Sequence, residues 1–285
     1  MSWSSPAHAF WVVIPAYNEG ATVRDVAARA RRYCTNVIVV DDGSTDGTVE
    51  ALDGLDVTLL RNEQNMGKAD SLWYGFQWAL GHGASGVITV DADGQHAPEE
   101  IPTFVATTLD TSDIFVIGAR RPVERKASSW RYLANRMADF WISWAAGCPI
   151  EDSQSGFRLY PARLLEQLTL KHGRQQSFVF ESEVLIEAAR QGVCLRFISV
   201  AVTPRLGPRT SHFRPVMDIV RITKMVALKL LSRGLYPQGF YRAFLRSRHT
   251  YGISERAVDR PQVGVAESTS QNAETVSCAL PVVRS

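Results

Sequence analysis

Short apolar runs that end in acidic residues recur along the chain and constrain its fold most strongly. Residues 37–40 and 87–90 are too short for helices and rich in β-branched side chains, so each is predicted to be a buried strand. Each run leads into two carboxylates: Asp41 and Asp42 after the first, Asp91 and Asp93 after the second. Segments with helical spacing alternate with such runs. The alternation predicts an α/β fold with a doubly wound, mostly parallel sheet.

The predicted topology gathers polar side chains at one edge of the sheet. Crossovers between parallel strands are almost always right-handed, so the strands deliver their carboxyl ends to one edge, where open α/β sheets bind ligands. The side chains expected to share this crevice are Tyr17, Glu19, Asp41, Asp42, Lys68, Asp91 and Asp93. Clustered carboxylates repel one another and raise their own pKa values unless something compensates them. A divalent cation bound with a diphosphate, together with a ribose and its base, would satisfy these carboxylates.

The residues after the run 87–90 indicate which cation this would be. Asp91, Asp93 and the amide of Gln95 offer hard oxygen donors, which suit Mg²⁺ or Mn²⁺. Lys68 offers a positive point charge for phosphate. The alternative is that both acidic segments are only polar turns beside helix starts. That alternative gives no role to Glu19 or Lys68.

Composition and charge narrow the class of protein. The chain has 285 residues, of which 45% are hydrophobic and 21% charged, and a net charge of +2, so nothing indicates a nucleic-acid partner and none is expected. The cysteines have no metal-ligand spacing and are expected to be thiols in a reducing cytosol. The first residues lack the features of a signal peptide, and no window offers about 20 uncharged apolar residues. We therefore expect a cytoplasmic protein, soluble or peripheral on a membrane.

Several ordered motifs together resemble family 2 glycosyltransferases, and among these the polyprenyl-phosphate (dolichyl-phosphate-type) mannosyl- and glucosyltransferases. The resemblance covers about residues 10–230. Its motifs are VIPAYNE at 13–19, VDDGSTDGT at 40–48, NxGK at 65–68, DADGQH at 91–96, DSQSGFR at 152–158, FESE at 180–183 and RTSHF at 209–213. Ala69 departs from the pattern, which often has a second Gly there. The Q-x-x-R-W motif of processive synthases is absent, so one sugar per turnover is expected.

The resemblance implies a fold, a donor and site residues. It implies a GT-A-like nucleotide-sugar domain, a nucleotide-diphosphate sugar, a divalent metal and inversion at the anomeric carbon. Asp93 and Gln95 would hold the metal, with Asp91 beside the nucleotide. The base and ribose would be lined by Pro15, Tyr17, Glu19 and Asp42. Arg120 would lie near phosphate; the alternative is a surface pair with Arg121.

The acceptor side is predicted from residues further along the chain. In relatives that glycosylate hydroxyls, the aspartate in the region of Asp152 is the catalytic base. A phosphate monoester is already ionised and needs none, and with such an acceptor Asp152 would position the acceptor or the metal. Arg158 can pair with a carboxylate or phosphate, and a salt bridge to Asp152 is the alternative. The acceptor or phosphate side is completed by Arg131, Arg209 and Ser211. Residues 128–146 are predicted as an amphipathic helix that serves as core, as a lid over a lipid, or as both.

The C-terminal part differs in composition from the rest. Residues 205–248 are strongly basic, with Asp218 as the only acidic residue, and apolar residues are interleaved. Basic amphipathic helices of this kind suit an anionic membrane surface, although a helix packed on the domain with a solvated basic face is the alternative. We predict a glycosyltransferase domain over residues 1–214, a basic amphipathic helical region over 215–250 and a disordered tail over 251–285.

The predicted function is hexose transfer from a UDP- or GDP-sugar to a lipid-linked phosphate, peripheral on the inner face of the cell membrane. A hydroxyl acceptor on a lipid or glycan is the nearest alternative. A sugar-1-phosphate nucleotidyltransferase would need a Gly-rich, basic loop after the first strand, where Pro15 to Glu19 stand instead. A non-catalytic nucleotide-sugar-binding subunit would not need Asp93, Gln95 and Asp152 together.

Overall fold

The structure, a computed structural model, describes residues 10–108, 113–120, 129–169, 177–203 and 215–246. All of these belong to one unit, Met1–Thr250, and the tail predicted over 251–285 lies outside the described residues. Seven strands form one sheet: β1 Phe10–Ala16, β2 Val37–Asp41, β3 Thr58–Arg61, β4 Gly86–Thr89, β5 Ile114–Arg120, β6 Arg158–Pro161 and β7 Cys194–Val200. Their order is β3-β2-β1-β4-β6-β5-β7, and only β6 runs antiparallel to its neighbours within this described sheet. The predicted doubly wound, mostly parallel sheet is confirmed.

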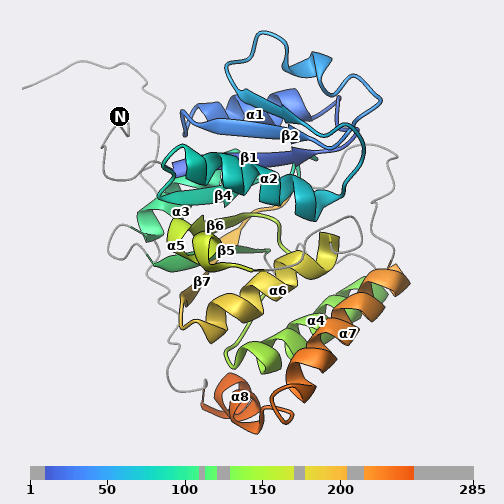
Figure 1. The fold of residues 1–285 in the computed structure, drawn as a ribbon, viewed down its shortest axis with the longest axis vertical. Coiled ribbons are helices and arrows are strands. Elements are labelled where there is room, and N and C mark those ends of the chain that lie inside the picture. Colours follow the sequence, from blue (N-terminus) through green and yellow to red (C-terminus); the bar gives the residue numbers. More distant parts are fainter. Residues whose placement is uncertain (1–9, 109–112, 121–128, 170–176, 204–214, 247–285) are drawn as a thin grey trace, which may run out of the picture. The chain divides into compact units, whose positions relative to one another are not determined.

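Helices cover both faces of the sheet (Figure 1). The α-helices are α1 Val23–Arg31, α2 Lys68–Gly81, α3 Ile101–Thr107, α4 Ser129–Ala146, α5 Ala162–Gln167, α6 Ser177–Arg190, α7 Pro215–Leu231 and α8 Pro237–Phe240. Short 3₁₀ turns lie at Glu50–Leu52 and Pro98–Glu100, and a π-helical turn, η4, spans Tyr241–Arg246. One core cluster joins α1 and α3 to the sheet, and the other joins α2, α5 and α6 to its opposite face.

The strand sequences explain how the sheet separates these two clusters. Successive side chains of a strand point to opposite faces. In β1, Val13 belongs to the α2 cluster while Val12 and Ile14 belong to the α1 cluster, and all three are fully buried. On α1 the buried residues Val23, Val26, Ala27 and Ala30 recur with the spacing of one helical face.

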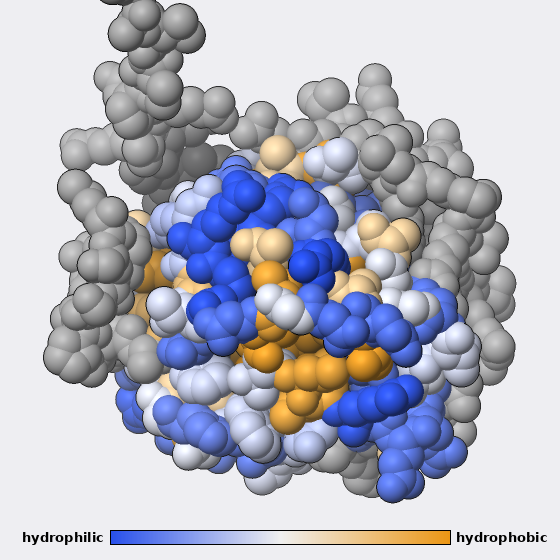
Figure 2. Space-filling view, turned by 90° about the horizontal axis from the view of Figure 1, so that it is seen from above, coloured by the Kyte–Doolittle hydropathy of each residue, from blue (hydrophilic) through white to orange (hydrophobic). Residues whose placement is uncertain are grey.

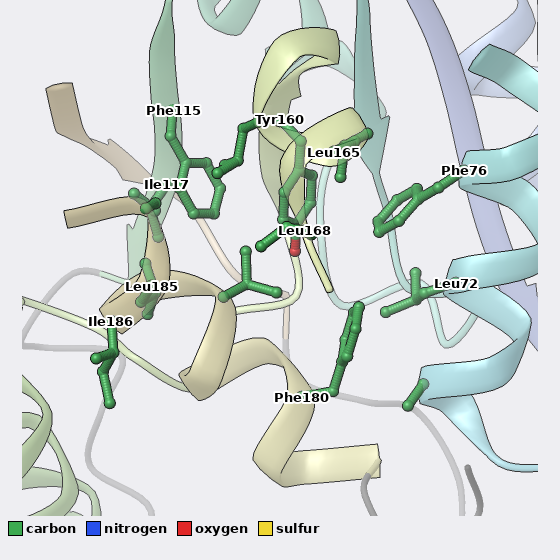
Figure 3. Close-up of a cluster of buried hydrophobic side chains, with 14 of the residues drawn as sticks. Leu72, Phe76, Phe115, Ile117, Tyr160, Leu165, Leu168, Phe180, Leu185 and Ile186 are labelled. Carbon is green, nitrogen blue, oxygen red and sulfur yellow. The ribbon is translucent and has the colours of Figure 1, made fainter. Parts of the chain in front are cut away.

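The larger core cluster lies between α2, β5, β6 and α6 (Figure 3). Tyr160 of β6 lies at its centre, with ring centroids 5.0 Å from Phe76 of α2 and 4.6 Å from Phe115 of β5. Phe180 of α6 closes the cluster and is fully buried. Full burial of a Phe side chain contributes about 1.5–3 kcal/mol, so these rings fix α2 and α6 against the strands.

Helices α4 and α7 form a further layer over α6 (Figure 1). On α7, Ile222, Val226 and Leu230 recur every fourth residue and are buried in the α2–α6 cluster. On its other side α7 exposes Leu228 and Leu231. The amphipathic character predicted for this C-terminal helix is therefore present, and the helix packs on the domain through its apolar face.

Polar side chains also tie α7 to the domain. Lys229 Nζ lies 2.9 Å from Glu183 Oε1 and 3.8 Å from Glu187 Oε2, both on α6.

The β3 edge of the sheet carries exposed hydrophobic side chains. Figure 2 looks onto the side where β3 lies and shows hydrophobic side chains ringed by polar ones. Leu59 of β3 is 39% exposed there. None of the helices in the described ranges combines the length and apolar character needed to cross a bilayer.

Candidate active site

Two loops at the carboxyl edge of the sheet are fastened to each other by Asn18. Its backbone φ is 54°, in the left-handed region, which short polar side chains tolerate best among non-glycine residues. The Asn18 N–H donates to Ser44 Oγ at 2.8 Å, and its Oδ1 accepts from the N–H groups of Thr45 and Asp46 at 2.8 and 3.3 Å. The Glu19 N–H donates to Thr48 Oγ1 at 2.8 Å. The loop after β1, with Tyr17 and Glu19, is thereby fixed to the loop after β2.

Asp42 fixes a third loop to this pair. Its carboxylate accepts from Asn62 Nδ2 and from the N–H groups of Met66 and Gly67, each at 2.8 Å. Such charge-assisted bonds to backbone are stronger than neutral ones. They hold the segment that leads into Lys68, the first residue of α2. We call residues 17–20, 42–48 and 62–67 the loop cluster.

Asp41 lies beneath the loop cluster. Its side chain is fully buried, accepts from the Ser44 N–H at 3.1 Å and lies 3.2 Å from Arg61 Nε. Pro15 lies in β1 and pairs in register with Val40 of β2. Asp41 and Asp42 thus shape the loops through contacts within the protein.

Lys68 lies between two carboxylates that come from different elements. Its Nζ is 2.7 Å from Asp91 Oδ1, which follows β4, and 3.3 Å from Glu181 Oε1 on α6. Burial by itself lowers the pKa of the ammonium, but the two carboxylates more than offset this and raise it. Burial opposes ionisation of Asp91, yet Lys68, and then His96, lower its pKa overall. Both groups are therefore charged near neutral pH.

Asp152 and Arg120 form a second ion pair. Arg120 Nε donates to Asp152 Oδ2 and Nη2 donates to Oδ1, each at 2.8 Å, and the Arg120 N–H donates to Oδ2 at 3.1 Å. Burial lowers the pKa of the guanidinium, but the bond to Asp152 more than offsets this and raises it. The alternative salt bridge from Asp152 to Arg158 is not what the structure shows. We call Lys68, Asp91, Arg120, Asp152 and Glu181 the ion-pair cluster.

Arg158 differs from its expected role at a phosphate. Its side chain is fully buried, and its N–H groups donate to the backbone carbonyls of Ser155 at 2.7 Å, Glu181 at 2.7 Å and Ser153 at 2.8 Å. It has no exposed surface to offer a ligand. Because β6 begins at this edge and runs back into the sheet, Arg158 fixes the turn 153–155 to α6 from inside. We therefore correct its assignment to that of a positioning residue.

Gly156 shows how closely this turn approaches Asp91. A Cβ at position 156 would lie 2.4 Å from Asp91 Oδ2, a distance that real Cβ atoms do not show, so only glycine leaves the carboxylate in place. Thr89 Oγ1 donates to the Gly156 carbonyl at 2.7 Å. On α4, Asp139 Oδ1 accepts from the N–H and hydroxyl of Ser153 at 2.9 and 2.7 Å. Helix α4 thus supports the turn beside Asp152.

The segment with Asp93 and Gln95 forms the remaining wall. Asp93 Oδ1 accepts from the Gln95 N–H at 3.0 Å, and the Gln95 carbonyl accepts from the Thr203 N–H at 2.9 Å. His96 is 6% exposed and forms an antiparallel bridge with Val202. Burial lowers the pKa of His96, while the charges of Asp91, Arg120, Lys68 and Asp152 all act on it. These four charged groups therefore lie around His96.

The side-chain oxygens on the wall formed by Asp93 and Gln95 suit a hard divalent cation. Asp93 and Gln95 offer carboxylate and amide oxygens, the type of ligand that Mg²⁺ and Mn²⁺ prefer. Within the described ranges, no group of three or more His, Cys, Asp or Glu residues is arranged to hold a metal. The two oxygen donors of Asp93 and Gln95 suit a cation that takes its other ligands from phosphate and water.

Most of the predicted site residues come together at this edge. Sequence reasoning gave no role to Asn18 or Glu181. Both stand in motifs quoted above, but their contacts are made with segments that are distant in the chain. Arg131 lies near the start of α4. Arg209 and Ser211 lie outside the described residues, as do residues 204–208, which follow Thr203.

Comparison with known proteins assigns this sheet, with Lys68 among carboxylates at its carboxyl edge, to the glycosyltransferases with a GT-A-like fold. The family model described as "Glycosyl transferase family 2" matches residues 11–171. The chain therefore belongs to glycosyl transferase family 2.

The names of two relatives join a sugar, mannose, to a lipid of the polyprenyl type. The chain is 28% identical over 211 residues to polyprenol monophosphomannose synthase of Mycolicibacterium smegmatis, which covers 70% of this chain and 79% of the relative. It is 30% identical over 206 residues to undecaprenyl-phosphate mannosyltransferase of Micrococcus luteus, with 67% and 81% covered.

A solved structure confirms the fold. Glucosyl-3-phosphoglycerate synthase from Mycobacterium tuberculosis, in complex with Mn²⁺, UDP-glucose and phosphoglyceric acid, matches with a TM-score of 0.59 at 22% identity, covering 80% of each chain. At this identity the likeness shows the fold alone.

Proposed function

We propose that this chain transfers a hexose from a UDP- or GDP-sugar to a polyprenyl-phosphate-type lipid acceptor, with inversion and with Mg²⁺ or Mn²⁺. One observation carries the proposal: Lys68 is held between Asp91 and Glu181 at the edge where the loop cluster ends. A diphosphate needs such a cation, and the carboxylates can accept from hydroxyl groups of a sugar. The names of the two mannosyl-transferring relatives support the acceptor class.

The loop cluster would receive the nucleotide. Tyr17 and Glu19 lie on a loop whose backbone Asn18 fixes, and Asp42 fixes the loop that leads to Lys68. A site built before its ligand arrives loses little conformational entropy on binding. Pro15, Tyr17, Glu19 and Asp42 are therefore proposed to line the base and ribose, with Asp41 supporting them from beneath.

Asp93 and Gln95 would hold the metal. A bound divalent cation would neutralise the charge that develops on the leaving diphosphate. Lys68 adds a fixed positive charge from the protein. Asp91 would orient Lys68, because the two side chains lie 2.7 Å apart and Gly156 keeps the carboxylate in position.

The proposed transfer needs no general base. An oxygen of the acceptor phosphate forms the bond to the anomeric carbon, the bond from that carbon to the diphosphate breaks, and the nucleoside diphosphate leaves. The attacking oxygen is already ionised, so no proton has to be removed. One displacement inverts the anomeric centre. Asp152, paired with Arg120, would position this arginine toward phosphate, with Arg131, Arg209 and Ser211 as further proposed acceptor contacts.

The place of action follows from the acceptor. A lipid-linked phosphate is confined to a bilayer, so the enzyme is proposed to act at an anionic membrane surface as a peripheral cytoplasmic protein on the inner face. Nucleic acid has no part in this function. One sugar is transferred in each turnover.

The test uses calorimetry with UDP- and GDP-sugars, with and without Mn²⁺, and transfer to a short-chain polyprenyl phosphate. Wild type is expected to bind one donor class tightly only with metal. Asp93→Ala should lose metal-dependent binding and transfer, because the diphosphate charge is left uncompensated. Asp53→Ala, an exposed acid of the same domain, is the matched control and should behave as wild type.

Three results would contradict parts of the proposal. Full activity of Asp93→Ala, or of wild type in excess chelator, would remove the metal. Transfer to a lipid or glycan hydroxyl but not to the phosphate would replace the acceptor. Donor binding without transfer to either acceptor would favour a nucleotide-sugar-binding subunit.

A further inference from the structure

One continuous apolar surface lies on the layer that α4 adds to the domain. Leu133, Met137 and Phe140 follow one another at helical spacing of four and three residues, so they share one face of α4. Leu133 is 51% exposed and Met137 52% exposed, while Ile142 on the opposite side of the helix is fully buried. A helix inside the domain would not leave this face uncovered.

The surface continues onto α8 and η4. The ring centroid of Phe140 lies 6.4 Å from that of Phe240 and 4.9 Å from that of Phe244, and the Phe244 ring is stacked on it. Beside these rings, Tyr241 is 57% exposed and Leu245 60% exposed. We call Leu133, Met137, Phe140, Phe240, Tyr241 and Leu245 the apolar face.

A strained turn fastens the two parts of this face together. Leu235 and Tyr236 have φ values of 62° and 44°, which are unfavourable for large side chains. Trp144 Nε1 of α4 donates to the Tyr236 carbonyl at 3.2 Å. A Cβ at Gly147 would lie 2.9 Å from the Tyr236 hydroxyl, and a Cβ at Gly239 would lie 2.1 Å from the Tyr236 ring. The Tyr236 side chain therefore fits closely between the two glycines. The face is therefore a built surface.

The exposed charged side chains on the segments that carry the apolar face and on α7 after Ile222 are basic in the described residues. Residues 222–245 contain no acidic residue. Lys229 is engaged by Glu183 and Glu187, and Arg233 lies over the Tyr236 ring, 3.9 Å from its centroid. Lys224 and Arg242 are exposed, as is Arg136 on α4 between Leu133 and Met137. Apolar side chains accompanied by cations match a bilayer that contains anionic lipids.

Helix α4 also connects this face to the site. Asp139, one residue before Phe140, holds Ser153 through two hydrogen bonds, and Ser153 is next to Asp152. A shift of α4 would therefore move the turn at the acceptor side. This coupling gives a reason for a lipid-facing surface on this particular helix.

We infer that the apolar face inserts into the interfacial region of an anionic bilayer and holds the active-site edge near a membrane-bound acceptor. The inference rests on the proposed function for the identity of that acceptor. It places the membrane contact on α4, α8 and η4, because Lys229 and Leu230 of the basic helix α7 are engaged within the domain. A second copy of the chain is less favoured, because like charges would face each other across a two-fold axis.

The experiment compares the full-length chain with two variants. Met137→Glu with Leu245→Glu places two acids on the apolar face, and Leu59→Glu places one on the exposed side of β3 as a control. Co-sedimentation uses vesicles of phosphatidylcholine with phosphatidylglycerol. The double variant should bind at least about tenfold more weakly, because buried apolar area is lost and anionic lipid is repelled. Leu59→Glu should match wild type.

Transfer to a short-chain, water-soluble polyprenyl phosphate separates this inference from the proposed function. The double variant should keep wild-type transfer to that acceptor and lose transfer to a long-chain acceptor in vesicles. If wild type binds vesicles through this face but transfers no sugar to either acceptor, the proposed function fails and the face stands. Equal vesicle binding by the double variant and wild type would overturn the inference.

A photo-crosslinking residue at position 137 reports the occupant directly. Cross-links to lipid in the presence of vesicles are expected. Cross-links to residues 247–285 of the same chain, or between two chains, with no lipid product would overturn the inference in favour of those occupants. Circular dichroism of each variant confirms that a loss of binding is not a loss of folding.

Discussion

The loop cluster and the ion-pair cluster lie at the same edge of the sheet but are built in different ways. In the loop cluster, side chains such as Asn18 and Asp42 bond to backbone N–H groups of neighbouring loops. In the ion-pair cluster, carboxylates are matched with cations: Lys68 with Asp91, and Arg120 with Asp152. Backbone bonds fix a shape, whereas an ion pair can exchange a carboxylate for a phosphate. We therefore propose that the first cluster sets the fit of the donor and that the second responds to its charge.

The largest effect is expected at Lys68. Lys68→Met should lower kcat/KM about 10²- to 10³-fold, the usual result of removing one fixed charge or donor from the reacting phosphate. It also removes the ammonium that lowers the pKa of Asp91. Steady-state kinetics and urea unfolding are measured together. If unfolding shifts as much as activity, Lys68 belongs with the loop cluster instead.

Asp42→Ala should act mainly on stability. It leaves the buried N–H group of Gly67 and the part-buried N–H group of Met66 without their acceptor, which costs roughly 1–3 kcal/mol for a buried unsatisfied group and less for an exposed one. On that basis we expect the free energy of unfolding to fall by about 3 kcal/mol in urea titrations. The exposed control Asp53→Ala should stay within about 0.5 kcal/mol. An unchanged stability would show that the loops do not depend on Asp42.

Asp152→Asn tests the chemistry of the acceptor. With a phosphate acceptor the loss should stay well below the roughly 10²- to 10⁴-fold that a general base contributes, and the pH–rate profile should keep its shape. A loss in that range on a hydroxyl acceptor would identify Asp152 as a base. Arg120→Gln serves as a comparison, because it breaks the same ion pair and leaves the carboxylate in place.

The smallest effect is expected from Tyr160→Phe, behind the ion-pair cluster. Burial raises the pKa of Tyr160 to about 12 from 10.0, and its hydroxyl has no hydrogen-bond partner among the described residues. Below about pH 10 the change should be nearly neutral. Between about pH 10 and 12 the unfolded phenol ionises while the folded one does not, so wild type loses about 1.4 kcal/mol per pH unit at Tyr160. Unfolding measured at about pH 7 and about pH 11 should show that only wild type carries this contribution.

Elements whose signal is local can be predicted from the sequence. The strands at residues 37–40 and 87–90 and the amphipathic helix over 128–146 appear as expected, because apolar spacing and segment length decide them. Strand β6 is not predicted in this way. It has four residues, ends in Pro161 and runs antiparallel between β4 and β5, so its existence depends on neighbours distant in the chain.

The candidate site was predictable in its location but not in its pairing. Strand ends bring Asp41, Asp42 and Asp91 to one edge whatever the details of packing. The partner of each charge depends on tertiary distances: Glu181 reaches Lys68 from α6, and Arg158 turns inward to three carbonyl groups. A motif names Arg158 as a cation near phosphate, but only the fold shows which way its side chain points.

The antiparallel course of β6 has a consequence for how such enzymes change their acceptor. The chain leaves the sheet after β5 and re-enters it at β6, and the Gly118 N–H donates to the Phe157 carbonyl at 2.9 Å, so the excursion opens and closes at adjacent backbone positions. The part of the chain that carries α4 and Asp152 is therefore inserted between two neighbouring strands, after β5 ends at Arg120 and before β6 begins at Arg158. An insertion at this point can differ between relatives while β5 keeps its pairing with β6 and β7, so exchanging it is a way to redirect the acceptor while the donor loops stay as they are.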